Sequence, residues 1–125
     1  MTVLVDTSVW IDHLRRGNAD LADLLSQGAV IIHPYVVGEL ACGNLRNRRE
    51  ILTLLQALPM ASVLEHEEAL EFLDDKHLHG RGLGWIDVHL LASARLENVK
   101  LWSLDKALVS AAASLGIERG SRAER

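Results

Sequence analysis

The sequence predicts one α/β domain, in which a central parallel sheet of four to five strands is flanked by helices on both faces. Short runs of Val, Ile and Leu alternate along the chain with longer segments whose apolar residues recur every three or four positions. Strands that alternate with helices in this way form parallel sheets that are covered on both sides. The length of 125 residues suits one domain, and 49% hydrophobic residues supply its core.

Capping and turn residues divide the chain into its expected elements. Thr7 and Ser8 offer a helix N-cap directly after the first strand. Asn47, with Glu50 three residues later, predicts a capping box. The expected order is a strand at 2–5, helices at 8–16 and 19–27, a strand at 29–33, helices at 35–42 and 47–57, a strand at 60–63, helices at 65–79 and 85–97, a strand at 100–104, a helix at 105–115 and a short last strand from 116. We expect the domain to span residues 1–118 and the polar residues 119–125 to form a disordered tail.

The bulk composition narrows the classes of function. A net charge of −4 argues against a general electrostatic nucleic-acid binder, because such proteins are usually basic. The single cysteine, Cys42, excludes an intrachain disulfide, and we expect it to be a small core residue. The start of the chain lacks the pattern of a signal peptide, and no apolar run reaches about 18 residues. We therefore expect a cytoplasmic protein.

Four acids are expected to meet at one edge of the sheet. In a parallel α/β sheet, the carboxyl ends of the strands and the starts of the following helices share one edge, where such folds bind ligands. Asp6 ends the first strand, and Asp105 directly follows the fourth. Glu39 lies in the early turns of the helix after the second strand, and Asp87 lies in the first turn of the helix after the glycine-rich loop.

The surroundings of two of these acids point to a bound cation. Asp87 shares a helix face with Leu90 and Leu91, and Glu39 lies one turn after Tyr35. Acids on apolar faces are rarely left without a partner. Converging carboxylates also repel each other, which a divalent cation would relieve. Oxygen ligands without cysteine favour magnesium or manganese over zinc.

Simpler roles exist for some of these acids taken singly. Asp6 and Asp105 could each cap the helix that follows, and Asp87 could stabilise a helix through its dipole. The joint pattern is more informative, because four independent coincidences would have to fall on the same edge.

Two further signals are set aside. His77 and His79 are two residues apart, a spacing that points their rings in different directions on a helix, so we expect no zinc site there. The three tryptophans are expected in the core or at an interface and not as platforms for base stacking; they are Trp10, Trp85 and Trp102.

Taken together, the ordered motifs resemble a known family. They are VLVDTSVWID at the start, VVGEL around Glu39, WIDVHLLASA around Asp87 and LWSLDKAL around Asp105. The chain resembles the PIN-domain ribonucleases from Val3 to about Ile117, and within them the VapC-type toxins of bacterial toxin–antitoxin pairs.

This resemblance implies a specific activity and site. It implies an endoribonuclease that holds one or two magnesium or manganese ions, which activate water for attack on phosphorus. It also implies a cognate antitoxin as partner, and a homodimer that assembles with it into a larger complex. The residues implied as catalytic and metal-binding are Asp6, Glu39, Asp87 and Asp105, with Ser8 and Ser103 lining the site.

The basic residues suggest where RNA would bind. Arg46, Arg48 and Arg49 form the densest basic cluster, and Arg15 with Arg16 forms another. Such patches suit single-stranded RNA, although each arginine could equally belong to a solvated helix end.

Other functions are compatible with parts of the pattern. A phosphohydrolase of the haloacid dehalogenase type needs an aspartate two residues after Asp6, where Ser8 stands instead. A receiver domain needs a lysine at a late strand end, and Lys106 is poorly placed for it. A non-catalytic PIN fold that binds RNA or protein is the third alternative, and the intact set of acids argues against it.

Overall fold

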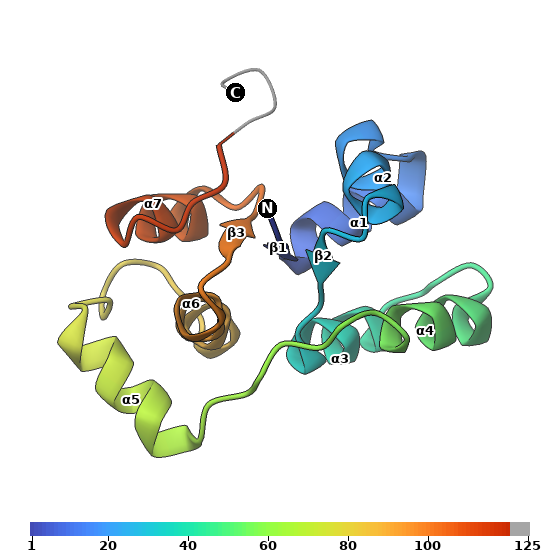
Figure 1. Ribbon diagram of the computed structural model, residues 1–125. Helices are drawn as coiled ribbons and strands as arrows, with labels where there is room; N and C mark the ends of the chain where they lie inside the picture. Colours follow the sequence, from blue (N-terminus) through green and yellow to red (C-terminus); the bar gives the residue numbers. More distant parts are fainter. Residues whose placement is uncertain (121–125) are drawn as a thin grey trace.

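The computed structural model of the chain describes residues 1–120. Three short strands and seven helices follow one another there in the alternating order that the sequence predicts (Figure 1). The elements are β1 (Val3–Val5), α1 (Thr7–Arg16), α2 (Ala19–Ser26), β2 (Val30–Ile31), α3 (Pro34–Cys42), α4 (Arg48–Gln56), α5 (His66–Asp75), α6 (Trp85–Glu97), β3 (Lys100–Trp102) and α7 (Lys106–Ser114).

The sheet is parallel, and its first strand lies in the middle. The strand order is β2-β1-β3, with Val3 paired to Val30 on one side and to Lys100 on the other. The chain therefore moves to one side of β1 first and later crosses to the other side. The carboxyl end of β1 is a topological switch point, the place where open α/β sheets bind ligands. Asp6 follows β1 directly at this point.

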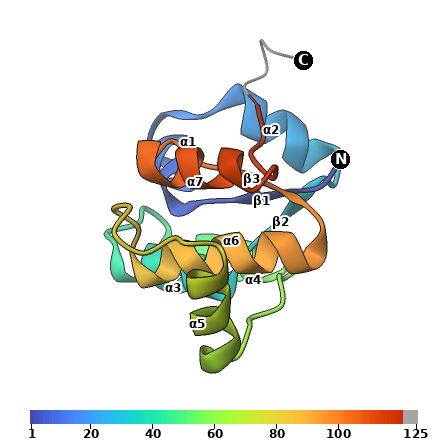
Figure 2. The same cartoon turned by 90° about the vertical axis from the view of Figure 1, so that its left-hand side faces the viewer.

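Helices cover both faces of the sheet. Figures 1 and 2 agree in placing α1, α2 and α7 on one side and α3, α4 and α6 on the other, with α5 packed outside α6. In Figure 2, β1 runs from the amino terminus on the right toward the left of the view, where the loop that leads into α6 also lies. The predicted fold class, a parallel sheet flanked by helices on both faces, is confirmed.

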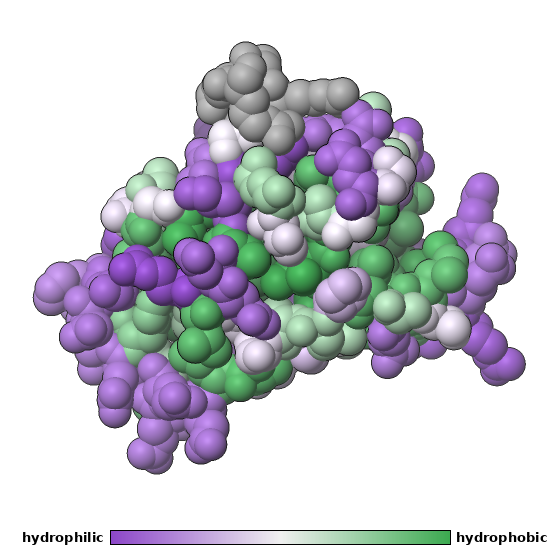
Figure 3. All heavy atoms as spheres, in the orientation of Figure 1, coloured by the Kyte–Doolittle hydropathy of each residue, from purple (hydrophilic) through white to green (hydrophobic). Residues whose placement is uncertain are grey.

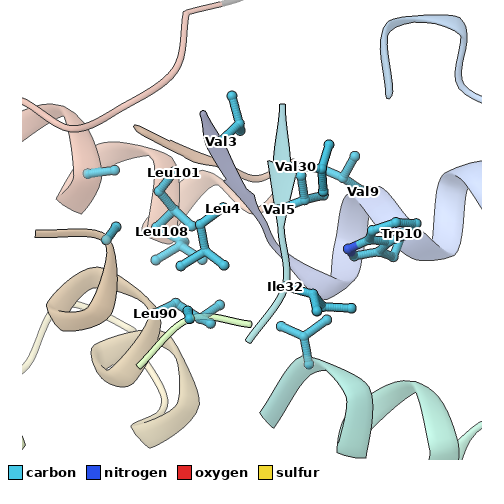
Figure 4. Packing of buried hydrophobic residues seen from close by; sticks show 14 of the residues in the cluster. Val3, Leu4, Val5, Val9, Trp10, Val30, Ile32, Leu90, Leu101 and Leu108 are labelled. Atoms are coloured by element: carbon cyan, nitrogen blue, oxygen red, sulfur yellow. The ribbon is translucent and has the colours of Figure 1, made fainter. Parts of the chain in front are cut away.

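Aliphatic side chains from the sheet and from both helical layers fill the core. Leu4, Leu90, Leu101 and Leu108 lie on the left of Figure 4, and Trp10 lies on the right. Each is at most 2% exposed. Burying one such side chain contributes about 1.5–3 kcal/mol relative to leaving it in water. These contacts hold α1, α6 and α7, which begin at the same edge, in fixed positions around β1.

The two outermost predicted strands are reduced to single bridges. Ile32 pairs with Met60 and Leu101 pairs with Glu118, both in parallel. The sheet thus has three strands, with one isolated bridge on each side. Sequence reasoning overestimated these strands because an apolar run shows that a segment is buried, but not that a neighbouring strand pairs along it.

Two local expectations were wrong. Asn47 adopts a left-handed conformation with φ 54° and makes no side-chain cap bond, so the predicted capping box does not form. The helix expected at 65–79 ends at Asp75, because Lys76 leaves helical geometry and His77 has φ 53°.

The end of the described chain is anchored by a buried arginine. The guanidinium of Arg119 donates to both carboxylate oxygens of Asp20, at 2.8 and 2.9 Å, and lies 4.4 Å from the ring centre of Trp102. Arg119 is 4% exposed. We call these three residues the Arg119 clamp. The sequence placed residue 119 in a polar tail, whereas it packs against the domain; residues 121–125 lie outside the described part.

The surface is hydrophilic mainly over the outer helices. Figure 3 shows hydrophilic residues gathered over α4 and α5, with hydrophobic residues across the middle of the face that Figure 1 presents. Within residues 1–120, no helix is long and apolar enough to cross a lipid bilayer.

Candidate functional site

Asp6 is the most enclosed of the predicted site acids. It directly follows β1, and its backbone N–H donates to the carbonyl of Trp102 at 2.9 Å, which ties it to β3. Its carboxylate Oδ2 accepts hydrogen bonds from the hydroxyls of Ser8 at 2.7 Å and Ser103 at 2.8 Å. Asp6 is 6% exposed. Two hydroxyls from distant parts of the chain therefore hold one side chain in a fixed orientation.

The same two serines join the starts of two helices. The hydroxyl of Ser8 accepts from the N–H of Leu104 at 3.0 Å, and that of Ser103 accepts from the N–H of Asp105 at 2.9 Å. The two hydroxyl oxygens are 3.4 Å apart. Asp105 in turn caps α7, since its Oδ1 accepts from the N–H of Ala107 at 3.1 Å. Capping and membership of the site are thus compatible in Asp105.

Glu39 is connected to the site by Thr7, a residue that the sequence analysis did not predict as part of the site. The hydroxyl of Thr7 donates to Oε1 of Glu39 at 2.6 Å and so connects α3 to the start of α1. Glu39 itself is exposed, so the expectation that it lies on an apolar face was wrong. A hydroxyl directly after Asp6 was the available signal for Thr7, but it was interpreted only as a helix cap.

Asp87 shows that the four acids affect one another. It lies in the first turn of α6, where its Oδ2 accepts from the N–H of Gly84 at 2.9 Å. Burial raises the pKa of Asp87, and the negative charges of Asp6, Asp105 and Glu39 raise it further, while the hydrogen bond from Gly84 opposes them. All three other predicted acids act on this one carboxyl group. We call the four residues together the acid edge.

Each acid of the edge accepts hydrogen bonds through only one of its two carboxylate oxygens. Within residues 1–120, the hydrogen bonds described above use Oδ2 of Asp6, Oε1 of Glu39, Oδ2 of Asp87 and Oδ1 of Asp105, and the other oxygen of each accepts none. The ion pairs of the described residues join Arg16 to Asp12 and Arg119 to Asp20, so none reaches the edge. The edge is therefore a fixed group of like charges with free oxygens.

These properties fit a hard divalent cation. Carboxylate and hydroxyl oxygens are the ligands that magnesium and manganese prefer. In the described residues, no three His, Cys, Asp or Glu side chains already stand close enough to enclose a metal ion. Because the free carboxylates repel one another, an entering cation would have to draw them together. The donor types and the uncompensated charge fit such an ion.

The predicted RNA-binding arginines fall into two groups. Arg15 and Arg46 line a groove of about 500 Å³ that also includes Glu39, so they lie next to the acid edge. Arg48 donates to the carbonyl of Ala41 at 2.9 Å, which makes it a cap for the end of α3. Arg49 is exposed on α4.

One histidine is buried near the site, and the single cysteine is not. His33 is fully buried at the start of α3, and its Nδ1 accepts from the N–H of Tyr35 at 2.9 Å. Burial, and secondarily the neighbouring His89, lowers the pKa of His33 to about 4. His33 is therefore neutral near pH 7, with its proton on Nε2. Cys42, which was expected in the core, is exposed.

Comparisons with known proteins agree with this architecture. The family model described as the PIN domain matches residues 3–114. The protein called ribonuclease VapC32 in Mycobacterium tuberculosis, in the CDC 1551 / Oshkosh and ATCC 25618 / H37Rv strains, is 43% identical over 116 residues, or 92% of this chain and 94% of that protein.

Two solved structures share the fold at low identity. PAE2754 from Pyrobaculum aerophilum has a TM-score of 0.64 and 14% identity over 89% of this chain and 84% of its own. FitAcB from Neisseria gonorrhoeae has a TM-score of 0.58 and 19% identity over 90% of this chain and 94% of its own. At these identities the likeness concerns the fold alone.

Proposed function

Because this chain belongs to the PIN domain family, we propose that it is a metal-dependent endoribonuclease and the toxin of a VapBC-type toxin–antitoxin pair. The name of its 43% identical relative supports ribonuclease activity and the VapC type. The observation that carries the metal dependence is the acid edge itself, where the charges of three acids raise the pKa of the fourth.

In this proposal the acids bind the cation and the serines orient the acids. Asp6, Glu39 and Asp87 would hold magnesium or manganese with their free oxygens, and Asp105 would do so directly or through water. When bound, the ion supplies activation of a water molecule and neutralisation of charge at the phosphate. Ser8 and Ser103 keep the carboxylate of Asp6 in one orientation, since both donate to the same oxygen. Thr7 does the same for Glu39.

We propose that Arg15 and Arg46 contact the RNA backbone. Both line the groove that includes Glu39, so a phosphate chain leaving the acid edge would meet their guanidinium groups. Arg49 is a more distant candidate on α4. Arg48 contributes less, because it is already engaged with the end of α3.

The VapC type extends the proposal to protein partners. We propose a cognate antitoxin that restrains the nuclease, and a homodimer that assembles with it in the cytoplasm. Co-expression of the chain with the product of a neighbouring small reading frame, followed by gel filtration, tests both partners. A complex of defined mass supports them, and a chain that elutes as a monomer with and without that product contradicts them.

The first experiment is cleavage of total RNA by the isolated chain. Reactions contain magnesium, manganese or EDTA, and compare the wild type with Asp6→Asn and Asp87→Asn. We expect discrete fragments only with a divalent ion and intact acids. Removing a residue that hydrogen-bonds to a metal ligand commonly lowers metal affinity or activity about 10- to 100-fold. Removing a ligand itself should therefore lower the cleavage rate more than about 100-fold.

Glu71→Gln provides the matched control, because Glu71 is an exposed acid on α5 and lines a pocket that contains none of the four acids of the edge. It should cleave like the wild type. Cleavage that persists in EDTA, or that survives both edge substitutions, would contradict the metal-dependent mechanism. Binding of manganese without any cleavage would argue against the ribonuclease itself.

A further inference from the structure

Five aromatic rings form a continuous cluster beside the acid edge. The ring centres of Trp85 and His89 are 4.8 Å apart, those of Tyr35 and His89 are 4.9 Å apart, and those of His33 and Tyr35 are also 4.9 Å apart. His66 of α5 adds a contact of 5.3 Å to Trp85. The chain has only five Phe, Trp and Tyr residues, and two of them lie in this cluster. His33 and His89 are buried whereas His66 and Trp85 are exposed, so the cluster extends from the interior to the surface.

The ring cluster and the acid edge share the same two helices. Tyr35 and Glu39 are four residues apart on α3, a spacing that places them on the same face. Trp85 and Asp87 both lie in the first turn of α6. His89 contacts both Tyr35 and Trp85, so it connects the two helix starts. Both helices therefore carry an acid of the edge and at least one ring of the cluster.

The cluster is buried on its inner side and open at Trp85. His33 and His89 are 0% and 1% exposed, whereas Trp85 is 37% exposed. The planes of Trp85 and His89 meet at 89°, a perpendicular contact that holds the indole in place while leaving much of it in water. Of the two places expected for Trp85, the core or an interface, the core is contradicted by this exposure. An exposed indole on a rigid support is what base stacking requires.

Base stacking would add RNA affinity that the negative charge of the chain does not oppose. The chain has a net charge of −4, and the four acids of the edge repel a phosphate unless a cation lies between them. Stacking of a base on an aromatic ring adds affinity without charge and accepts any base. We propose that Trp85 is a stacking platform for a nucleobase of single-stranded RNA, next to the phosphate held at the acid edge. This rests on the proposed ribonuclease function.

Binding of a fluorescently labelled seven-nucleotide RNA tests this platform separately from cleavage. Anisotropy is measured with calcium in place of magnesium, as a hard cation that can hold the phosphate at the edge, and again in EDTA, for the wild type, Trp85→Phe and Trp85→Leu. We expect Trp85→Leu to bind about 10-fold more weakly, within the range for one stacked base, and Trp85→Phe to stay within a few-fold of the wild type. RNA without bases should bind equally to the wild type and Trp85→Leu.

Leu96→Ala is the matched control, because Leu96 lies on the same helix, at its other end, and is 63% exposed. It should bind RNA like the wild type, and all variants should keep the wild-type thermal unfolding temperature. Equal RNA affinity of Trp85→Leu and the wild type would overturn the platform, even if cleavage is observed. If Trp85→Leu keeps its RNA affinity but loses self-association or antitoxin binding, the exposed ring belongs to a protein interface instead. A chain that fails to cleave but shows the Trp85 effect would retain the platform and refute only the nuclease.

Discussion

The acid edge and the Arg119 clamp hold charged groups in opposite ways. In the clamp, a buried guanidinium donates to both carboxylate oxygens of Asp20 and lies over the ring of Trp102. Its positive charge is therefore neutralised by a direct ion pair. At the edge, four acids of the same sign are fixed by neutral donors, and within residues 1–120 no basic side chain forms an ion pair with them. The clamp thus pairs its charges, whereas the edge holds unpaired charges of one sign within these residues.

The difference shows two ways in which the fold holds charged side chains. A buried charge that supports the fold needs a partner of opposite sign, because an uncompensated one costs several kcal/mol. Hydroxyls orient Asp6 and Glu39, and backbone N–H groups orient the other two carboxylates, without neutralising them. The fold thereby keeps net negative charge at the switch point of the sheet, which is where a cation would be useful.

The largest expected change in the free energy of unfolding comes from removing the ion pair of the Arg119 clamp. Asp20→Asn should destabilise the domain by about 3 kcal/mol, since it leaves the charge of Arg119 buried beside a neutral amide. Urea unfolding followed by circular dichroism measures this loss. The double variant Asp20→Leu with Arg119→Met should recover much of it, and cleavage per folded molecule should be unchanged in both. A loss below about 1 kcal/mol for Asp20→Asn would show that the clamp contributes little.

Lowering the pH should destabilise the folded domain through protonation of His33 in the unfolded chain. The pKa of this buried ring is about 4 in the folded chain, below its ordinary value of 6.5, so between these values the unfolded chain binds a proton that the folded chain does not. The free energy of unfolding should therefore fall as the pH drops from 6.5 toward 4, by at most about 1.4 kcal/mol per pH unit from this group. Denaturant titrations at several pH values measure the slope.

His33→Asn separates this effect from the titration of the carboxyl groups. Asparagine can still accept the hydrogen bond from the N–H of Tyr35, and it does not titrate in this range. The variant should lose the part of the slope that lies between pH 6.5 and 4. An unchanged slope would mean that His33 is not protonated on unfolding.

The smallest expected change in the free energy of unfolding comes from removing one charge of the acid edge. Burial and the three neighbouring acids raise the pKa of Asp87, so its ionised form disfavours the folded state. Asp87→Asn should therefore raise the free energy of unfolding in EDTA by up to about 1 kcal/mol, while cleavage is lost. Added magnesium should stabilise the wild type more than the variant, because only the wild type keeps all its ligands. A variant less stable than the wild type in EDTA would show that the carboxylate is structurally required.

Local patterns predicted the helices better than the ends of the sheet. The helix at 85–97 has the predicted bounds, because its periodic apolar residues and its flanking Gly84 and Asn98 are all local features. The strands near Met60 and Glu118 are reduced to bridges, since pairing depends on a partner distant in sequence. The exposure of Cys42 also depends on which face of α3 is covered.

The sequence by itself determined the alternation of strands and helices, the parallel sheet and the positions of four acids near strand ends. It could do so because hydrophobic periodicity and capping act over a few residues. Only the tertiary structure decided that Thr7 would orient Glu39, that Ser8 and Ser103 would share one oxygen of Asp6, and that Arg119 would close over Trp102. Thr7 and Glu39 are 32 positions apart, and Ser103 and Asp6 are 97 positions apart, and chain packing alone brings such residues together.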